Sequence, residues 1–195
     1  MEILLIRHTT VAVPKSVCYG QSDVALADSF EGEKEAILDQ IKVKWGKKMP
    51  DALFSSPLQR CQKLADFLGE TWSMKPQFDD LLKEMNFGDW ENKAWKDIPN
   101  SELNPWMADF VNIATPNGEC YDDLHQRTHF FIEKCLEHDL KSIVIVTHAG
   151  NIRSFMSYAL GLPLENSFRI HLDYGAMAAL VLSTEKTYNK LLFLT

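Results

Sequence analysis

The sequence predicts an α/β fold in which helices cover both faces of a mostly parallel sheet, giving a three-layer α/β/α sandwich. Short apolar runs alternate with segments in which apolar residues recur at helical spacing. The run "IVIV" at 143–146 is continuously β-branched, as in a strand buried on both faces of a sheet. Because 195 residues suit one hydrophobic core, we expect a single domain, 1–195.

The first half of the chain predicts two strands, each followed by a helix. Apolar residues at 3–6 form the first strand, and helical spacing over 30–45 predicts a helix with Ser29 as its N-cap. "DALFSS" contains the second strand, 52–55. Pro57 suits the first turn of the next helix, whose apolar stripe is Leu58, Cys61, Leu64, Ala65 and Leu68.

The second half begins irregularly, because residues 84–118 contain three prolines and three tryptophans. We interpret this segment as short helices in an excursion from the sheet. A long helix is expected at about 119–138, followed by the strand "SIVIVTH" and a helix whose apolar stripe includes Ile152 and Phe155. The segments "SFRIHLD", "AMAALVLS" and "KLLFLT" are expected to close the chain as strands.

Composition and charge limit the function classes. The formal net charge of −7 argues against a general binder of nucleic acid or anionic membranes. "MEILLI" has no basic leader and no apolar run is long enough to span a membrane, so we expect a cytoplasmic location. His125 and His129 fall at the margin of a helical stripe and no C-x-x-C pair occurs, so neither a metal nor a cofactor is expected.

Unusual polar residues follow three of the predicted strands. The first strand delivers Arg7 and His8, the second is followed by Arg60 in the next helical turn, and "IVIVTH" delivers His148. In open α/β sheets the ligand crevice lies beyond the carboxyl ends of the strands. The sequence therefore predicts that these four side chains converge at one edge of the sheet.

Two arginines and two histidines at one edge suit a doubly charged oxyanion. The guanidinium fork matches phosphate oxygens in bidentate fashion, and amides at the two helix starts would add partial positive charge. The sequence contains no G-x-x-x-x-G-K-[ST] loop, no G-x-G-x-x-G fingerprint, no G-x-S-x-G elbow and no clustered acidic set. What remains is a metal-free phosphate site with a histidine that can accept a group covalently.

Four blocks of this sequence resemble the signature motifs of the histidine phosphatase superfamily, which has the phosphoglycerate-mutase-like fold. They are "LLIRHTT", "SSPLQRCQKLA", "LLKEMNFGDWE" and "VTHAGNIR", in the order of the family. The resemblance implies that His8 is the nucleophile and is transiently phosphorylated. It further implies that Arg7, Arg60 and His148 bind the phosphoryl group and that Glu84 gives a proton to the leaving alcohol.

Within this family, "RHTTVAVPKSVCYGQSDVALADSF" resembles the α-ribazole phosphatase branch. The resemblance implies removal of the 5′-phosphate of α-ribazole 5′-phosphate, or of its cobamide form, in cobalamin nucleotide-loop assembly. It places Gly20 and Gln21 beside the phosphate pocket. Tyr19 and Trp90 are weaker candidates for contacting the base or the ribose, because their rings could equally be buried in the core.

Two alternatives stay open from the sequence. One is a phosphoglycerate mutase or a broad phosphatase for small metabolites. Mutases of this fold carry a larger insert after the acid and a C-terminal tail that excludes water, whereas this sequence ends on "KLLFLT", so we expect hydrolysis. The remote alternative is a non-catalytic phosphate-binding module, which would be expected to lose His8 or Glu84. The expected partner is a small phosphate monoester, and the sequence predicts no oligomeric state.

Overall fold

The computed structural model describes residues 1–46, 48–138 and 140–195. These residues form one sheet with the strand order β3-β2-β4-β1-β5-β6. Neighbouring strands from β3 to β1 are parallel, β5 is antiparallel to both of its neighbours, and the predicted mostly parallel sheet is therefore confirmed. The strands are β1 (Glu2–Arg7), β2 (Ala52–Ser55), β3 (Gln77–Phe78), β4 (Ser142–Thr147), β5 (Met177–Val181) and β6 (Lys190–Leu194).

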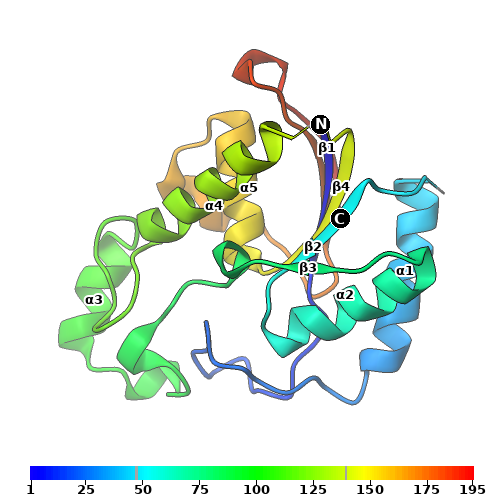
Figure 1. Cartoon of the computed structure of the whole chain (residues 1–195). Helices are drawn as coiled ribbons and strands as arrows, with labels where there is room; N and C mark the ends of the chain where they lie inside the picture. Colours follow the sequence, from blue (N-terminus) through cyan, green and yellow to red (C-terminus); the bar gives the residue numbers. More distant parts are fainter. Residues whose placement is uncertain (47, 139) are drawn as a thin grey trace.

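Helices cover both faces of this sheet, which confirms the predicted three layers (Figure 1). Helices α1 and α2 pack on one face of the sheet, and helices α4 and α5 pack on the other. The bounds of these four helices are Phe30–Lys44, Gln59–Trp72, Tyr121–Leu136 and Ala149–Leu160, in chain order. None of the helices in the described part of the chain is both long and apolar enough to cross a membrane.

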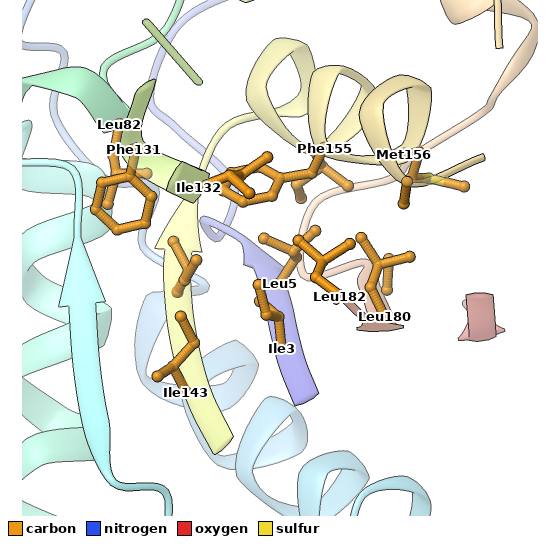
Figure 2. Close-up of a cluster of buried hydrophobic side chains, with 14 of the residues drawn as sticks. Ile3, Leu5, Leu82, Phe131, Ile132, Ile143, Phe155, Met156, Leu180 and Leu182 are labelled. Carbon is orange, nitrogen blue, oxygen red and sulfur yellow. The ribbon is translucent and has the colours of Figure 1, made fainter. Parts of the chain in front are cut away.

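Successive side chains of β1 point to opposite faces of the sheet and therefore enter two different hydrophobic cores. Ile3 and Leu5 pack with α4 and α5 in the cluster shown in Figure 2, whereas Leu4 and Ile6 pack with α1 and α2. All four side chains are fully buried. Burial on both faces explains why β1 and β4 are apolar along their whole length instead of alternating.

The segment 84–118 leaves the sheet, as expected, and contains the 3-10 helices η2 (Gly88–Trp90) and η3 (Trp95–Asp97) and the helix α3 (Asn100–Ala108). Its apolar side chains pack with residues of the loop after β1 and with the start of α4 in a third cluster. The buried members of that cluster are Cys18, Met85, Trp90, Ile98, Trp106, Tyr121 and Leu124.

One predicted strand is wrong. "SFRIHLD" does not extend; the chain forms the 3-10 helix η4 (Leu164–Arg169) and then an irregular stretch up to β5. Turn hydrogen bonds are made here instead of ladder bonds, since Asn166 N–H donates to Pro163 O and Ile170 N–H donates to Ser167 O. The alternating apolar pattern was misleading because Phe168 is half exposed.

Two predicted helix starts need correction. Pro57 lies outside α2, because Leu58 has extended backbone angles and occupies the N-cap. Ser29 does precede α1, but its hydroxyl makes no bond to the helix backbone and instead donates to Glu33 Oε1 at 2.6 Å. The sequence pattern predicts both helices, but it does not predict which groups bond to the backbone N–H groups of their first turns.

Two further details differ from expectation. Helix α4 begins at Tyr121 and not at 119, because the Asp123 carboxylate accepts the Cys120 N–H at 2.9 Å in a capping box. Strand β3 was not predicted, since it has two exposed residues and no apolar periodicity.

His125 and His129 on α4 are half-buried at the margin of its apolar stripe, as the spacing predicts. A ring nitrogen of His125 contacts Ser154 Oγ at 2.9 Å, and one of His129 lies 3.2 Å from a Glu133 oxygen.

Candidate active site

The carboxyl ends of the parallel strands β1, β2 and β4 lie at one edge of the sheet, which places the residues after them side by side. His8 follows β1 directly. Its backbone N–H donates to Thr147 O at 3.0 Å, and its carbonyl accepts from Gly175 N–H at 3.1 Å. The backbone that carries His8 is therefore fixed by the end of β4 on one side and by the turn before β5 on the other.

The His8 imidazole has a defined tautomer. Its Nδ1 lies 2.7 Å from Thr9 O, and because a carbonyl oxygen only accepts, Nδ1 carries the proton and Nε2 keeps a lone pair. Burial, followed by the positive charges of Arg60 and Arg7, holds the pKa of His8 well below its ordinary value, although the Thr9 carbonyl acts in the opposite direction. The ring is thus a neutral base with one free nitrogen.

Arg60, in the first turn of α2, is completely buried. Its Nη1 donates to Ser22 O at 2.8 Å and its Nη2 donates to Gly20 O. Its Nε donates to His148 Nδ1 at 3.3 Å. Three acceptors in different directions leave the planar guanidinium with one orientation.

His148 occupies the N-cap position of α5. It was expected to bind the phosphoryl group, but it contacts Arg60 and is not among the residues that line the active-site cavity. Because Nδ1 accepts from Arg60, Nε2 carries the proton and donates to Ser56 Oγ at 2.8 Å. Burial first, and then Arg60, holds the pKa of His148 well below its ordinary value. Its ring centroid is 5.2 Å from that of His8. Both of its nitrogens have protein partners, so His148 orients the Arg60 side chain and has no nitrogen left for a ligand.

Arg7 at the end of β1 is held by the segment before β5. Its Nη1 donates to Leu172 O at 2.6 Å, and its guanidinium carbon lies 4.1 Å from the centre of the Tyr174 ring. The Tyr174 hydroxyl is 2.6 Å from the hydroxyl of Tyr19. This contact joins the loop after β1 to the loop before β5.

Glu84 reaches the same edge from the start of the excursion. Its Oε1 accepts from Met85 N–H at 3.0 Å and its Oε2 accepts from Gly150 N–H at 3.1 Å. A Cβ atom on Gly150 would lie 2.2 Å from Glu84 Oε1, so only glycine allows this approach.

Two of the helix-start amides that were expected to face a bound anion have partners within the chain. The Gly150 amide in α5 is given to Glu84, and the Gln59 amide in α2 is given to Asp23 Oδ1 at 2.8 Å. Both carboxylates belong to the chain itself, so positive charge toward a substrate comes mainly from arginine side chains.

A cavity of about 130 Å³ lies where these side chains meet. Three arginines, Arg7, Arg60 and Arg153, line it with a single carboxylate, Glu84, so the wall carries a net positive charge. Of the residues expected from the sequence, Arg7, His8, Tyr19, Arg60 and Glu84 line this cavity; it is also lined by Met85, Phe87, Tyr121, Gly150, Arg153 and Phe168.

Gly20 and Gln21 lie next to the cavity and connect its parts. The Gln21 side-chain amide donates to Glu84 O at 3.0 Å. A Cβ atom on Gly20 would lie 1.9 Å from Met85 O, so the loop could not approach the Glu84 segment this closely with any other residue.

The Glu91 carboxylate holds this loop in place. It accepts the successive backbone N–H groups of Gly20, Gln21 and Ser22 at 3.0, 2.8 and 2.9 Å. Burial alone would raise the pKa of Glu91, but these hydrogen bonds outweigh burial and lower that pKa. The peptide group joining Gly20 to Gln21 points its N–H at Glu91 and its C=O at Arg60.

Trp90 does not line the cavity, which corrects its assignment as a substrate-contacting residue. The side chain is 1% exposed, and its indole N–H donates to Glu102 Oε2 at 2.8 Å. The ring packs edge-on against Trp106 with centroids 5.5 Å apart. Core packing within the excursion accounts for Trp90.

Sequence reasoning missed six cavity residues, among them Arg153, Tyr121 and Phe168. Arg153 had a usable signal, because it ends the block "VTHAGNIR" and lies one helical turn after Ala149 at the start of α5. Its Nε donates to Ile170 O at 3.0 Å, and its guanidinium lies 4.9 Å from the Phe168 ring centre. Phe168 was missed because the segment that contains it was predicted to be a strand.

A second hollow, of about 340 Å³, adjoins the cavity and shares Arg7, Tyr19 and Phe87 with it. We call it the aromatic groove because four of its lining residues are tyrosine, phenylalanine or tryptophan. Its remaining lining residues are Lys15, Val17, Trp95, His171, Leu172, Asp173 and Tyr174.

Residues 3–195 match the family model described as "Histidine phosphatase superfamily (branch 1)", and the chain belongs to this family. It is 28% identical over 148 residues to the "Putative phosphoserine phosphatase 2" of Hydrogenobacter thermophilus, covering 72% of this chain and 71% of that protein. It is 27% identical over 134 residues to the adenosylcobalamin/alpha-ribazole phosphatase of Escherichia coli, covering 67% of this chain and 66% of that protein.

Among solved structures, the alpha-ribazole phosphatase from Shigella flexneri has the same fold, with a TM-score of 0.87 at 23% identity over 100% of this chain and 96% of that one. The family and its phosphatase members make this chain a phosphatase, which is a hydrolase.

The two buried histidines predict a pH-dependent stability. The folded forms of His8 and His148 resist protonation, whereas the unfolded chain takes up protons as the pH falls below about 6.5. As the pH falls from 7 to 5.5, each of the two histidines should therefore lower the free energy of unfolding by about 1 kcal/mol. Urea unfolding of the parent and of His8→Asn at both pH values measures this, and the variant should lose about 1 kcal/mol less than the parent does.

The exposed His138 provides the control. His138→Asn should keep the pH dependence of the parent. If His8→Asn kept it as well, the folded state would not be excluding a proton from His8.

Proposed function

We propose that this protein hydrolyses phosphate monoesters through a phosphohistidine on His8. One observation carries the proposal: the free Nε2 lone pair of His8 shares a cavity of about 130 Å³ with Arg7, Arg60 and Glu84. A nucleophile, cations for the phosphoryl oxygens and a proton donor are what phosphoryl transfer to a side chain requires. All three contributions come from this chain's own residues.

In the first step the His8 Nε2 lone pair forms a bond to phosphorus while the bond from phosphorus to the ester oxygen breaks. Arg7 and Arg60 stabilise the negative charge on the equatorial oxygens. His148 is a positioning residue, since its Nδ1 accepts from Arg60 and keeps that guanidinium turned toward the phosphoryl group. Because His8 is neutral, no proton has to be removed before attack.

Glu84 completes this step by giving its proton to the departing alkoxide. A dianionic phosphoryl group in the same cavity favours the protonated carboxyl by like-charge repulsion. In the second step the ionised Glu84 takes a proton from water as the water oxygen attacks phosphorus. The electron pair of the N–P bond returns to Nε2, and phosphate leaves.

The covalent step predicts that His8→Ala lowers turnover by more than about 10³-fold on every ester that the parent cleaves. Rapid quenching of the parent with a ³²P-labelled substrate in excess chelator should trap acid-labile label on the protein, and none on the variant. His125→Ala, a substitution of a histidine on α4 outside the cavity, should retain both turnover and label. Full turnover by His8→Ala would refute the covalent mechanism.

The proton-donor role predicts a dependence on the leaving group. Glu84→Gln should lower kcat on an alkyl phosphate by about 10² to 10³-fold, because the alkoxide then leaves unprotonated. On p-nitrophenyl phosphate, whose leaving group needs little protonation, the loss should stay below about tenfold. Equal losses on the two esters would remove Glu84 from this role.

We further propose α-ribazole 5′-phosphate, or its cobamide form, as the substrate. The relatives from Escherichia coli and Shigella flexneri are named as alpha-ribazole phosphatases, which supports this assignment. So does the aromatic groove beside the cavity, since the rings of Trp95 and Tyr174 could stack on a heterocycle bound next to the phosphate. The Hydrogenobacter relative carries the name of a phosphoserine phosphatase, so small phosphorylated metabolites are the competing class.

A substrate panel decides between these classes. We expect kcat/KM for α-ribazole 5′-phosphate to exceed that for phosphoserine, 3-phosphoglycerate and sugar phosphates by at least about tenfold, which corresponds to about 1.4 kcal/mol. Trp95→Ala should lower kcat/KM for the first substrate only, and phosphoserine serves as the internal control for folding. A flat profile would instead indicate a broad phosphatase.

A further inference from the structure

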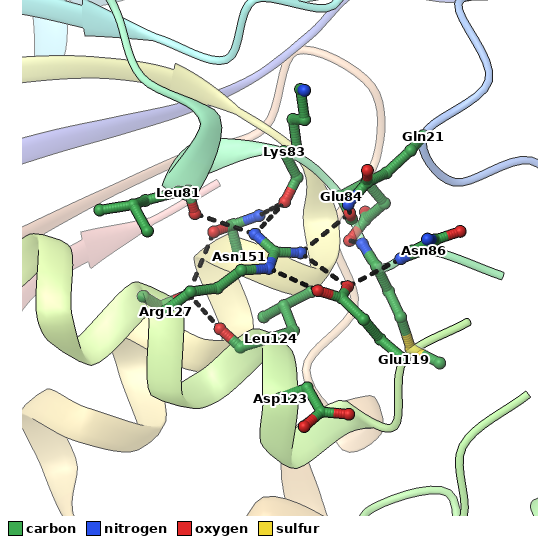
Figure 3. A network of polar contacts seen from close by, with 12 residues as sticks. Gln21, Leu81, Lys83, Glu84, Asn86, Glu119, Asp123, Leu124, Arg127 and Asn151 are labelled. Atoms are coloured by element: carbon green, nitrogen blue, oxygen red, sulfur yellow. Dashed lines mark hydrogen bonds and ion pairs between the residues drawn. The ribbon is translucent and has the colours of Figure 1, made fainter. Parts of the chain in front are cut away.

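Arg127 on α4 forms an ion pair with Glu119 at the end of the excursion, and neither residue lines the cavity (Figure 3). Arg127 Nε donates to Glu119 Oε1 at 3.0 Å and Nη2 donates to Oε2 at 3.1 Å, so both oxygens are engaged by one guanidinium. The side chains are 15% and 21% exposed. This geometry is the bidentate form that holds two side chains rigidly.

The remaining donors of Arg127 point at the segment that carries Glu84. Nη1 donates to Leu81 O at 2.9 Å and also to Lys83 O, and Nη2 donates to Glu84 O at 2.9 Å. These carbonyls lie just after a short 3-10 helix or within it, where the backbone offers them few partners of its own. One guanidinium therefore fixes three carbonyls within four consecutive residues.

Glu119 holds the other side of Glu84. Its Oε2 accepts Asn86 N–H at 2.8 Å, and its own backbone N–H donates to Asn86 O at 2.8 Å. Asn151 on α5 adds a bond from its amide to Lys83 O at 2.6 Å. Figure 3 shows these bonds converging on the chain before and after Glu84.

We propose that Arg127 and Glu119 are a positioning pair for Glu84, a role that rests on the proton-donor function proposed above. Backbone fixed on both sides of residue 84 sets the direction in which its carboxyl enters the cavity. Proton transfer depends steeply on such placement, since an error of about 1 Å can cost a factor of about 100. The pair makes no contact with Arg60, which Glu91 holds through the loop 20–22.

The test compares two esters, an alkyl phosphate and p-nitrophenyl phosphate. Arg127→Met should lower kcat on the alkyl ester by about 30-fold or more and on the aryl ester by less than about threefold, repeating in weaker form the pattern of Glu84→Gln. In the double variant Arg127→Met/Glu84→Gln the ratio of the two rates should equal that of Glu84→Gln alone, because the two residues act in one step.

Two more variants keep the test decisive. Glu119→Gln should give the same ester discrimination and provides the answer if Arg127→Met does not fold. Asp23→Asn is the matched control: Asp23 Oδ1 accepts the Gln59 N–H at the start of α2, so this variant makes the same carboxylate-to-amide change beside Arg60, and it should change both rates by similar factors.

The outcomes separate the two proposals. If Glu84→Gln itself shows no ester discrimination, the proton-donor role fails, and the positioning role fails with it. If Glu84→Gln discriminates but Arg127→Met and Glu119→Gln slow both esters equally, the pair only supports the fold. In that case this inference is overturned and the proton-donor role stands.

Discussion

The structure of the site depends on one fully buried cation, the guanidinium of Arg60. Its hydrogen bonds go to two backbone carbonyls and a neutral imidazole, none of which carries a charge. The negative charge that offsets it sits on Glu91, on the far side of the peptide group that joins Gly20 to Gln21. Burying a charge is costly unless it is compensated in this way. The loop 20–22 is therefore a polar link between the buried Arg60 and the half-buried Glu91.

A second consequence concerns how the site is divided. Glu91 and the loop 20–22 orient Arg60, whereas Arg127 and Glu119 fix the backbone around Glu84. The two networks meet at Gln21, whose amide donates to Glu84 O, and at Phe87, whose N–H donates to Glu91 Oε1 next to the Asn86 that Glu119 holds. The residues that we propose to bind the phosphoryl group and the residue that we propose to move a proton are thus held mainly by different side chains.

Much of this architecture could be predicted from the sequence because it follows from local signals. The continuous apolar runs of β1 and β4 indicated buried parallel strands, and the polar residues after them had to lie at one sheet edge. Other features depend on contacts between distant residues, which no local period encodes. Burial of Trp90 and the bonds of Arg127 to the Glu84 segment belong to this class.

In the segment 167–173 a local pattern is present but contacts between distant residues override it. Its alternating pattern fits a strand, yet turn hydrogen bonds and the packing of Ser167 against Ser157 decide its conformation. That error also hid Phe168, a wall of the cavity. Alternation over seven residues is too weak a signal when tertiary contacts oppose it.

The register of β1 has a consequence for the kinetics of folding. Glu2 pairs with Ser142 on one side and with Val181 on the other, so the strand that presents His8 gains its neighbours only through very long loops. Closing such loops costs entropy before any contact repays it, and folds rich in non-local pairs form slowly. A refolding chain in which β1 has not yet paired cannot place His8 beside the ends of β2 and β4, so turnover should return only with the insertion of β1.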